Sequence, residues 1–334
     1  MASTPTCLIL MSEQAYAAQF DQSRLDRLSA LTNLIHTGPC TDLDAMSDTQ
    51  LETVEVLITS WGAQELHATR LARLPRLHTV LHAAGSIRPI VSDALWDRHI
   101  AVSSAADHNA IPVAEYTLAC IIMAGKRATH YARNPRKSPS WNTLLGGNTS
   151  NYERTIGIVG FSRIGKRVIE LLKLLGKATV LVYDPIADPH EITRSGATQV
   201  DLTELLTRSD VVSLHAPALP ETHHMISHDE LALMRPDSTL INTARGSLVN
   251  TGALTEACIS GKISAYLDVT DPEPLPTQSA LYDLPNVFLT PHIAGALGTE
   301  TLRLTDHILD QLERVTRGLA LSSEITRTQF EVSA

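Results

Sequence analysis

The sequence predicts an α/β fold with two doubly wound domains, each built on a parallel sheet. The chain has 334 residues, which is more than a single hydrophobic core usually supports. Short apolar runs alternate with amphipathic segments in two separate series, and such alternation is typical of a parallel sheet with helices on both faces. A long apolar segment at residues 112–126 separates the two series and is expected to form a helix between the domains.

The first series occupies about the first third of the chain. Its apolar runs predict strands, and the segments with helical periodicity between them predict helices. The expected strands are residues 7–11, 54–60, 78–82 and 100–104, and the expected helices are residues 22–34, 63–73 and 92–98.

The second series follows a segment rich in Pro, Ser, Asn and Gly at residues 134–151, which predicts a surface loop. A last helix, expected at residues 299–317, has no strand after it and could fold back onto the first domain. The predicted domains are therefore 1–110 with 297–334, a discontinuous substrate domain, and 111–296. The expected strands of this series are residues 156–160, 179–184, 211–215, 239–243, 265–269 and 287–290.

Composition excludes several classes of partner. Hydrophobic residues make up 43% and charged residues 19% of the chain, as in folded globular proteins. A net charge of −9 and 4% aromatic residues argue against nucleic acid and membrane surfaces. The N-terminus lacks the basic region of a signal peptide. We therefore expect a cytoplasmic protein with no metal site, because the four cysteines are scattered without metal-type spacing: Cys7, Cys40, Cys120 and Cys258.

A glycine-rich turn after an apolar run is the most informative motif. The run that begins at Thr155 ends at the turn Gly160–Gly165, and a helical segment follows. Asp184 closes the next apolar run, 19 residues after Gly165. This order places a dinucleotide pyrophosphate on a helix N-terminus and a carboxylate on a ribose, so it predicts a Rossmann-type dinucleotide site.

The turn departs from the usual fingerprint at its middle glycine, which is Ser162 here. That glycine normally lets the backbone approach the pyrophosphate. The serine could loosen cofactor binding or donate its hydroxyl to a phosphate, although it could also be tolerated simply because it is small.

Three other segments place charged or titratable groups just after predicted strands. Arg245 follows one strand, and its guanidinium can bind a carboxylate and polarise a carbonyl. Asp268 and Glu273 flank a proline-rich turn after the next strand, and His292 ends the last one. Reduction of a carbonyl needs a hydride donor, a proton donor and a group that fixes the substrate. A histidine beside a carboxylate supplies the proton, because the carboxylate raises its pKa and orients it.

Over nearly its whole length the chain resembles the D-isomer-specific 2-hydroxyacid dehydrogenases, which depend on NAD. The resemblance rests on four motifs in the family's order and spacing. They are Gly157–Gly165, Asn242–Val249, Leu267–Pro276 and Pro291–Gly295. It implies a Rossmann-type NAD domain inserted into a flavodoxin-like substrate domain, a small 2-oxo or 2-hydroxy acid as substrate, and a homodimer. Cofactor and substrate are expected in the cleft between the domains.

The resemblance also implies roles for individual residues. Arg245 would bind the substrate carboxylate, His292 would exchange the proton with the carbonyl oxygen, and Glu273 would pair with His292. The turn Ala84, Gly85 and Ser86 would offer backbone N–H groups to the substrate. The residues expected to contact the cofactor are Gly160, Ser162, Arg163, Ile164, Gly165, Asp184, His215, Ala216, Pro217, Thr222, Thr243, Ala244, Arg245, Asp268, His292 and Gly295.

Some alternatives remain open on the sequence. Asp271 is a rival to Glu273 as the partner of the histidine. Arg88 or His82, beside an unusual substrate turn, could contact a second anionic group on the substrate, or Arg88 could lie in a structural ion pair. NAD(H) is expected over NADP(H), because Asp184 would repel a 2′-phosphate and the next residue, Pro185, offers no cation.

The overall function also has alternatives. The segment after Asp268 is similar to that of hydroxypyruvate and glyoxylate reductases, so the leading hypothesis is an NADH-dependent reductase of a small 2-oxo acid. The same scaffold could oxidise an unusual small anion, such as a phosphorus oxyanion or a phosphonate. A third possibility is a dinucleotide-sensing binding protein, since transcriptional corepressors share this fold.

Overall fold

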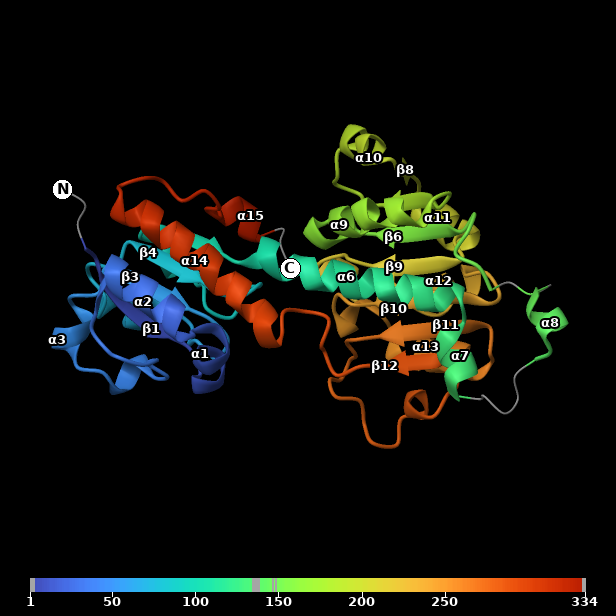
Figure 1. Ribbon diagram of the computed structural model, residues 1–334, viewed down its shortest axis with the longest axis horizontal. Helices are drawn as coiled ribbons and strands as arrows, with labels where there is room; N and C mark the ends of the chain where they lie inside the picture. The colour runs from blue at the N-terminus through green and yellow to red at the C-terminus, as the bar shows by residue number, and fades with distance from the viewer. Residues whose placement is uncertain (1–3, 134–138, 146, 148, 332–334) are drawn as a thin grey trace. The chain divides into compact units, whose positions relative to one another are not determined.

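The computed structural model describes residues 4–133, 139–145, 147 and 149–331 (Figure 1). It divides into two compact units, unit 1 with Met1–Ala110 and Ala296–Ala334, and unit 2 with Ile111–Gly295. Each unit contains a parallel sheet with helices on both faces. The predicted fold class is therefore confirmed.

Unit 1 is built on a five-stranded sheet in the order β2-β1-β3-β4-β5. Every neighbouring pair is parallel, and the strands turn alternate side chains toward two apolar layers. The strands are β1 (Thr6–Leu10), β2 (Asn33–Leu34), β3 (Val56–Thr59), β4 (Thr79–His82) and β5 (Ala101–Ser104).

Helices cover both faces of this sheet. One face packs Leu8, Leu57 and Val80 against the short helices α3, α4 and α5. The other packs Ile9 and Ile58 against α1, α2 and the returning helix α14. The bounds are α1 (Glu13–Gln19), α2 (Gln22–Leu31), α3 (Asp48–Leu51), α4 (Ala68–Ala72), α5 (Asp93–Asp97), α14 (Thr301–Thr316) and α15 (Arg327–Glu331).

Unit 2 is built on a seven-stranded sheet in the order β12-β11-β10-β9-β6-β7-β8, again parallel throughout. The order reverses at β6, which lies between β9 and β7, and such a switch point is where doubly wound sheets bind ligands. The strands are β6 (Thr155–Val159), β7 (Thr179–Tyr183), β8 (Thr198–Gln199), β9 (Val211–Leu214), β10 (Ser238–Asn242), β11 (Ile263–Leu267) and β12 (Val287–Leu289).

Two apolar layers sandwich this sheet as well. Leu240 and Leu214 face the layer that holds α11, α12 and α13, while Ile158 and Ile241 face the layer of α6 and α9. The bounds are α6 (Ala106–Gly125), α7 (Ala128–Arg133), α8 (Trp141–Leu145), α9 (Arg163–Leu172), α10 (Pro189–Ser195), α11 (Leu202–Arg208), α12 (His228–Leu233) and α13 (Thr251–Ile259).

The structure corrects several expected boundaries. The helix expected at residues 22–34 ends at Leu31, because Thr32 turns extended and the next two residues pair with β1. The helix expected from Pro112 begins at Ala106, with the proline inside it. Within the expected loop 134–151, Trp141–Leu145 form α8, while residues 134–138, 146 and 148 lie outside the described residues.

Two further observations concern membrane-spanning helices and cysteines. No helix among the described residues is long and apolar enough to cross a membrane. All four cysteines are free and buried.

Candidate active site

The glycine-rich turn lies where β6 gives way to α9. Gly160 has φ +101°, and a Cβ there would lie 2.6 Å from the backbone nitrogen of Ala216. A Cβ on Gly165 would lie 2.2 Å from the carbonyl oxygen of Gly160. Both positions therefore require glycine, which allows the turn to pack directly on the start of α9 and on the end of β9.

Ser162 is the N-cap of α9. Its Oγ accepts a hydrogen bond from the backbone N–H of Gly165 at 3.3 Å, as N-cap serines usually do. The serine at the middle-glycine position thus has a local structural role. Its oxygen is the acceptor in this bond, so its hydroxyl group can still donate a hydrogen bond to another molecule. Arg163 and Ile164 form the first turn of α9.

Asp184 links the turn to the end of β7. Its Oδ2 accepts from the backbone N–H of Phe161 at 2.7 Å, and its Oδ1 accepts from Ile186 and Ala187 at 3.0 Å each. A carboxylate has about four acceptor positions, so one remains for a further donor such as a ribose hydroxyl. The structure therefore brings Asp184 and the glycine-rich turn together.

The loop after β9 carries four of the predicted cofactor residues. His215 is buried, and its Nε2 lies 2.9 Å from the Oγ of Ser213. Burial lowers the pKa of His215 to about 3, so the ring is neutral and serves packing rather than proton transfer. Thr222 closes the loop by donating its hydroxyl to the carbonyl oxygen of Pro217 at 2.6 Å. Ala216 is buried beside Gly160.

The segment after β10 is shaped by Asn242, the first residue of the motif Asn242–Val249. Its Nδ2 donates to the carbonyl oxygen of Arg245 at 2.8 Å, and its Oδ1 accepts from the N–H of Ala244 at 3.1 Å. The buried hydroxyl of Thr243 lies 2.8 Å from that of Thr117. These bonds fix the backbone from which the Arg245 side chain projects.

Arg245 is partly buried and electrostatically close to Glu273. Burial lowers the pKa of the Arg245 guanidinium, and the Glu273 carboxylate opposes this by raising it. An arginine nevertheless stays protonated at neutral pH. A guanidinium with reduced hydration binds an anion more strongly than one in open water, which suits Arg245 to bind a carboxylate.

Asp268 holds the segment that follows β12. It is only 3% exposed. Its Oδ1 accepts from the hydroxyl of Thr290 at 2.7 Å and from the N–H of Ile293 at 2.8 Å, and its Oδ2 accepts from the N–H of Ala294 at 2.9 Å. The backbone carbonyl of Asp268 also accepts from the N–H of His292. Most of its acceptor capacity is therefore used inside the protein.

His292 pairs with Glu273. Its Nδ1 lies 2.7 Å from Glu273 Oε1, and both side chains are about half exposed, at 51% and 43%. The backbone of His292 has φ +57°, in the left-handed region. Within the described residues its Nε2 takes part in no hydrogen bond, so this nitrogen is available to another molecule. Asp271, the rival acid, makes no contact of this kind with the ring.

The turn Ala84, Gly85 and Ser86 belongs to unit 1, where it follows β4. His82, which precedes it, is buried, and its Nδ1 lies 2.9 Å from the hydroxyl of Thr59. Burial lowers the pKa of His82 to about 4, partly opposed by a hydrogen bond with the backbone of Ser86. His82 is therefore neutral and supports the turn from within.

Arg88 has partners in the C-terminal helix of the same unit. Its Nη2 donates to the carbonyl oxygens of Phe330 at 3.2 Å and Glu331 at 3.4 Å. Its guanidinium carbon lies 5.1 Å from the centre of the Phe330 ring. These contacts favour a structural role for Arg88 over the substrate contact considered from the sequence.

Sequence reasoning missed the residues that support the site from behind. Tyr116 on α6 places its hydroxyl 2.8 Å from that of Thr290, which in turn donates to Asp268. Burial raises the pKa of Tyr116 to about 12, so it remains a phenol. A tyrosine in an apolar helix gives no sequence signal of this contact, because its partner lies 174 residues away.

Comparison with known proteins identifies relatives of this chain. Residues 118–294 match the family model of the D-isomer specific 2-hydroxyacid dehydrogenase, NAD binding domain. The chain is 32% identical over 273 residues to D-3-phosphoglycerate dehydrogenase of Methanocaldococcus jannaschii, covering 80% of this chain and 51% of that protein. It is 33% identical over 270 residues to glyoxylate reductase of Aeropyrum pernix, covering 78% and 80%. The chain thus spans about half the length of the phosphoglycerate dehydrogenases it matches.

Solved structures show the same fold. The apo form of Rhodotorula graminis D-mandelate dehydrogenase matches with a TM-score of 0.81 at 25% identity, over 97% of this chain and 98% of that one. Aquifex aeolicus D-lactate dehydrogenase, solved with NAD and lactic acid, matches with a TM-score of 0.69 at 26% identity, over 93% and 96%.

The contact between the Arg245 turn and the Glu273 loop gives a testable prediction. A Cβ on Gly246 would lie 2.0 Å from the carbonyl oxygen of Thr270, so Gly246→Ala forces two backbone segments apart. We expect it to lower the free energy of unfolding by about 1–3 kcal/mol, measured by urea denaturation followed by circular dichroism.

Gly252→Ala is the matched control. Gly252 lies in the first turn of α13, and a Cβ there meets its nearest neighbour only at 3.4 Å. The same substitution at this position should be neutral or stabilising by roughly 0.4–1 kcal/mol. Equal stability of the two variants would show that the close contact at Gly246 does not exist.

Proposed function

The chain belongs to the family of D-isomer specific 2-hydroxyacid dehydrogenases, and we propose that it reduces a small 2-oxo acid to the D-2-hydroxy acid with NADH. The observation that carries the proposal is the 2.7 Å contact between His292 and Glu273, in the same unit as Arg245 and the glycine-rich turn. A proton donor, an anion-binding group and a dinucleotide-type turn thus all follow strands of one parallel sheet.

The residues of unit 2 fit a dinucleotide. The turn from Gly160 to Gly165 presents the N-terminus of α9, a ten-residue helix, and helix N-termini bind pyrophosphate through backbone N–H groups. Asp184 keeps one acceptor position for a ribose hydroxyl. When bound, NADH supplies the hydride. The fit supports cofactor binding by this turn, by Asp184 and by the loop from His215 to Thr222.

His292 would donate the proton. Glu273 contacts Nδ1, so the proton that is transferred to the carbonyl oxygen would be held on Nε2. This nitrogen forms no hydrogen bond with a described residue. The carboxylate fixes the orientation of the ring and stabilises its protonated form before transfer. In the reverse direction the neutral ring accepts the proton of the 2-hydroxyl group at the same nitrogen.

Arg245 would fix the substrate. Its guanidinium can bind the carboxylate of the 2-oxo acid in a bidentate manner and polarise the adjacent carbonyl. Its partial burial supports this role, because reduced hydration strengthens the attraction to an anion. We further propose that the turn Ala84, Gly85 and Ser86 offers backbone N–H groups to the substrate, as the family resemblance implies.

The remaining proposals concern the state and location of the protein. We propose a homodimer, as the family resemblance implies, that acts in the cytoplasm. Four free and buried cysteines support a reducing compartment. Asp268 would contribute its last acceptor position to the nicotinamide carboxamide, and Thr243, Ala244 and Gly295 would line the same part of the cofactor site.

The first prediction from the proposed function is turnover with one or a few 2-oxo acids. NADH oxidation should be measured with glyoxylate, hydroxypyruvate, pyruvate, oxaloacetate, a branched 2-oxo acid, phenylpyruvate, phosphonopyruvate and the 2-oxo acids of mandelate and 3-phosphoglycerate. We expect a clear best substrate, and His292→Asn should lower its kcat by about 10²–10⁴-fold, since general acid catalysis contributes that much.

Asparagine is the suitable replacement because it tolerates the left-handed backbone of His292. His99→Asn is the matched control, since His99 is also exposed and has φ +53°; it should keep full activity. If NADH binds but no 2-oxo acid is reduced, the protein is a dinucleotide sensor or acts on an unusual anion such as a phosphorus oxyanion.

The second prediction concerns the partner of His292. The Glu273 carboxylate lies 2.7 Å from the ring and orients it. Glu273→Gln removes this charged partner, so kcat for reduction should fall by about tenfold or more, as part of the contribution of the general acid is lost. Asp271→Asn removes a nearby charge that does not touch the ring, and its kcat should match that of the wild type. The opposite pattern would make Asp271 the partner of His292.

The third prediction concerns the choice of cofactor. The Asp184 carboxylate would lie beside a 2′-phosphate and repel it, so kcat/KM should favour NADH over NADPH by at least about tenfold, or about 1.4 kcal/mol. Asp184→Asn should lower the ratio of kcat/KM for NADH to kcat/KM for NADPH. Asp188→Asn, the same change at the N-cap of α10, should not. Equal kcat/KM for the two cofactors in the wild type would contradict the proposal.

A further inference from the structure

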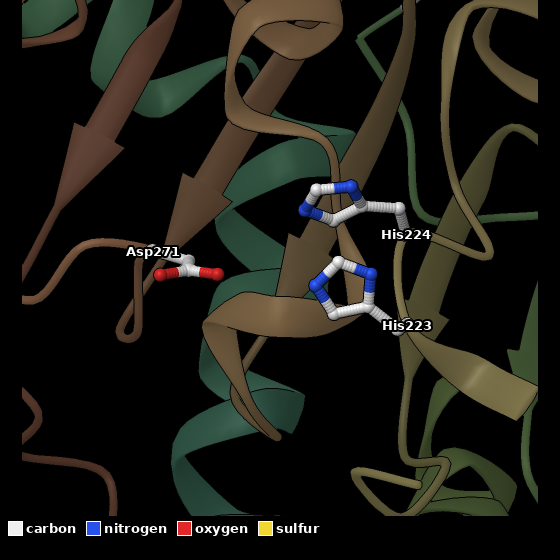
Figure 2. A group of neighbouring side chains, drawn as sticks. All are labelled: His223, His224 and Asp271. Atoms are coloured by element: carbon white, nitrogen blue, oxygen red, sulfur yellow. The ribbon is translucent and has the colours of Figure 1, made fainter. Parts of the chain in front are cut away.

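Two histidines and an aspartate meet on the surface of unit 2, outside the residues assigned above to catalysis or cofactor binding. His223, His224 and Asp271 each offer a ligand atom, and these three atoms all lie within 4.8 Å of one another. Figure 2 shows the two imidazole rings lying one above the other, each with a nitrogen on the side of the Asp271 carboxylate. The ring centres are 3.8 Å apart.

The three side chains come from two segments, the adjacent histidines from one and the aspartate from the other, and both segments are tied to a third one. The N–H of His224 donates to the carbonyl oxygen of Ser247 at 2.8 Å. The hydroxyl of Thr251 donates to the carbonyl oxygen of Asp271 at 2.6 Å. Both histidine and aspartate backbones are thus anchored to the stretch between Ser247 and Thr251. Anchoring of this kind lowers the entropic cost of bringing ligands together.

The ligand set selects a class of ion. Two imidazoles and one carboxylate suit zinc and similar transition-metal cations, whereas magnesium and calcium prefer oxygen ligands alone. Tetrahedral bonds of about 2.0–2.2 Å would separate the ligand atoms by roughly 3.3–3.6 Å. The present ligand atoms all lie within 4.8 Å of one another, so the spacing exceeds these values by at most roughly 1.2–1.5 Å. Since His223 and Asp271 are exposed and His224 is partly exposed, small side-chain rotations can close the difference.

The ligand atoms are also accessible. Among the described residues, the side chains of His223, His224 and Asp271 form no hydrogen bond or ion pair, and the two histidine rings contact each other. An ion therefore displaces only water from them. The left-handed backbone of His224, with φ +52°, turns its side chain onto that of the preceding residue.

We propose that His223, His224 and Asp271 bind one divalent cation of the zinc class, with water completing the coordination. Asp271 lies two residues before Glu273, so the bound ion would restrain the segment that orients His292. A cation at this site would thereby slow reduction. The binding itself does not depend on the reaction, whereas this second consequence rests on the proposed function.

Binding is tested directly, without substrate or cofactor. Untagged full-length protein is freed of metal with a chelator and titrated with zinc chloride by isothermal calorimetry, with magnesium chloride as the comparison ion. We expect one zinc per chain and no saturable magnesium binding. Loss of an outer-shell partner alone costs about 10–100-fold in metal affinity, so loss of a ligand by His224→Asn should weaken zinc binding at least about tenfold.

Two more variants make the result specific. His99→Asn repeats the substitution at another histidine with a left-handed backbone, one that is exposed, and it should bind zinc as the wild type does. His223→Gln tests the site without altering a left-handed residue, and it should weaken binding as His224→Asn does. Absence of saturable zinc binding by the wild type, or equal affinity in all four proteins, would overturn the proposal.

The effect on turnover is tested with the same proteins. Zinc should inhibit the wild type and His99→Asn at the concentration at which it binds, and His224→Asn should resist at that concentration. Equal inhibition of all three would place the inhibitory ion on the exposed pair His292 and Glu273 and would refute the restraint through Asp271. Because calorimetry needs no turnover, failure of the ion site and failure of the proposed enzymatic activity remain distinguishable.

Discussion

The carboxylate of Asp268 accepts hydrogen bonds from Thr290, Ile293 and Ala294, and these bonds fix the backbone on both sides of His292. Burying a carboxylate costs free energy unless hydrogen-bond donors satisfy it. The three donors therefore allow Asp268 to be buried, and its charge in turn holds the donors in place. The N–H of Asp268 donates to the carbonyl oxygen of Asn242, which begins the turn leading to Arg245. One buried acid thus sets the position of His292 and connects it with the segment that carries Arg245.

Sequence patterns could predict the architecture because parallel sheets bury their strands on both faces. Such strands are continuous apolar runs, and nearly all of them were recognisable. The exceptions are the two-residue edge strands β2 and β8, which are too short to carry a period and arise from pairing with β1 and β7. The predicted helix ends were wrong for a similar reason. Thr32 ends α2 because the next residues join the sheet, and a local pattern cannot register that tertiary contact.

The glycine-rich turn, Asp184, Arg245 and His292 could be found from the sequence because each follows a strand at the same edge of a sheet. The resemblance favours Glu273 as the partner of His292, but the residues alone leave Asp271 open, since Asp271 and Glu273 lie in one short loop and only the fold aims one of them at the ring. The cluster of His223, His224 and Asp271 was missed for a related reason. Adjacent histidines 47 residues from an aspartate have no metal-type spacing, and the expectation of no metal site rested on the cysteines alone.

His292 and Glu273, which face each other, are held in place in different ways. His292 occupies a left-handed conformation that costs of order 1 kcal/mol or more, and it is held there by the bonds to Asp268, at the end of a strand buried in the sheet. Glu273 lies in a loop outside the sheet, held by the hydroxyl of Thr251 on Asp271 and by the close packing of Gly246 on Thr270. Since the histidine side is fixed by the core, the geometry of the pair is most easily altered from the Glu273 side. A ligand on Asp271 acts on that less firmly held side, which is why a surface ion could alter the geometry of the pair although His292 is anchored to the core.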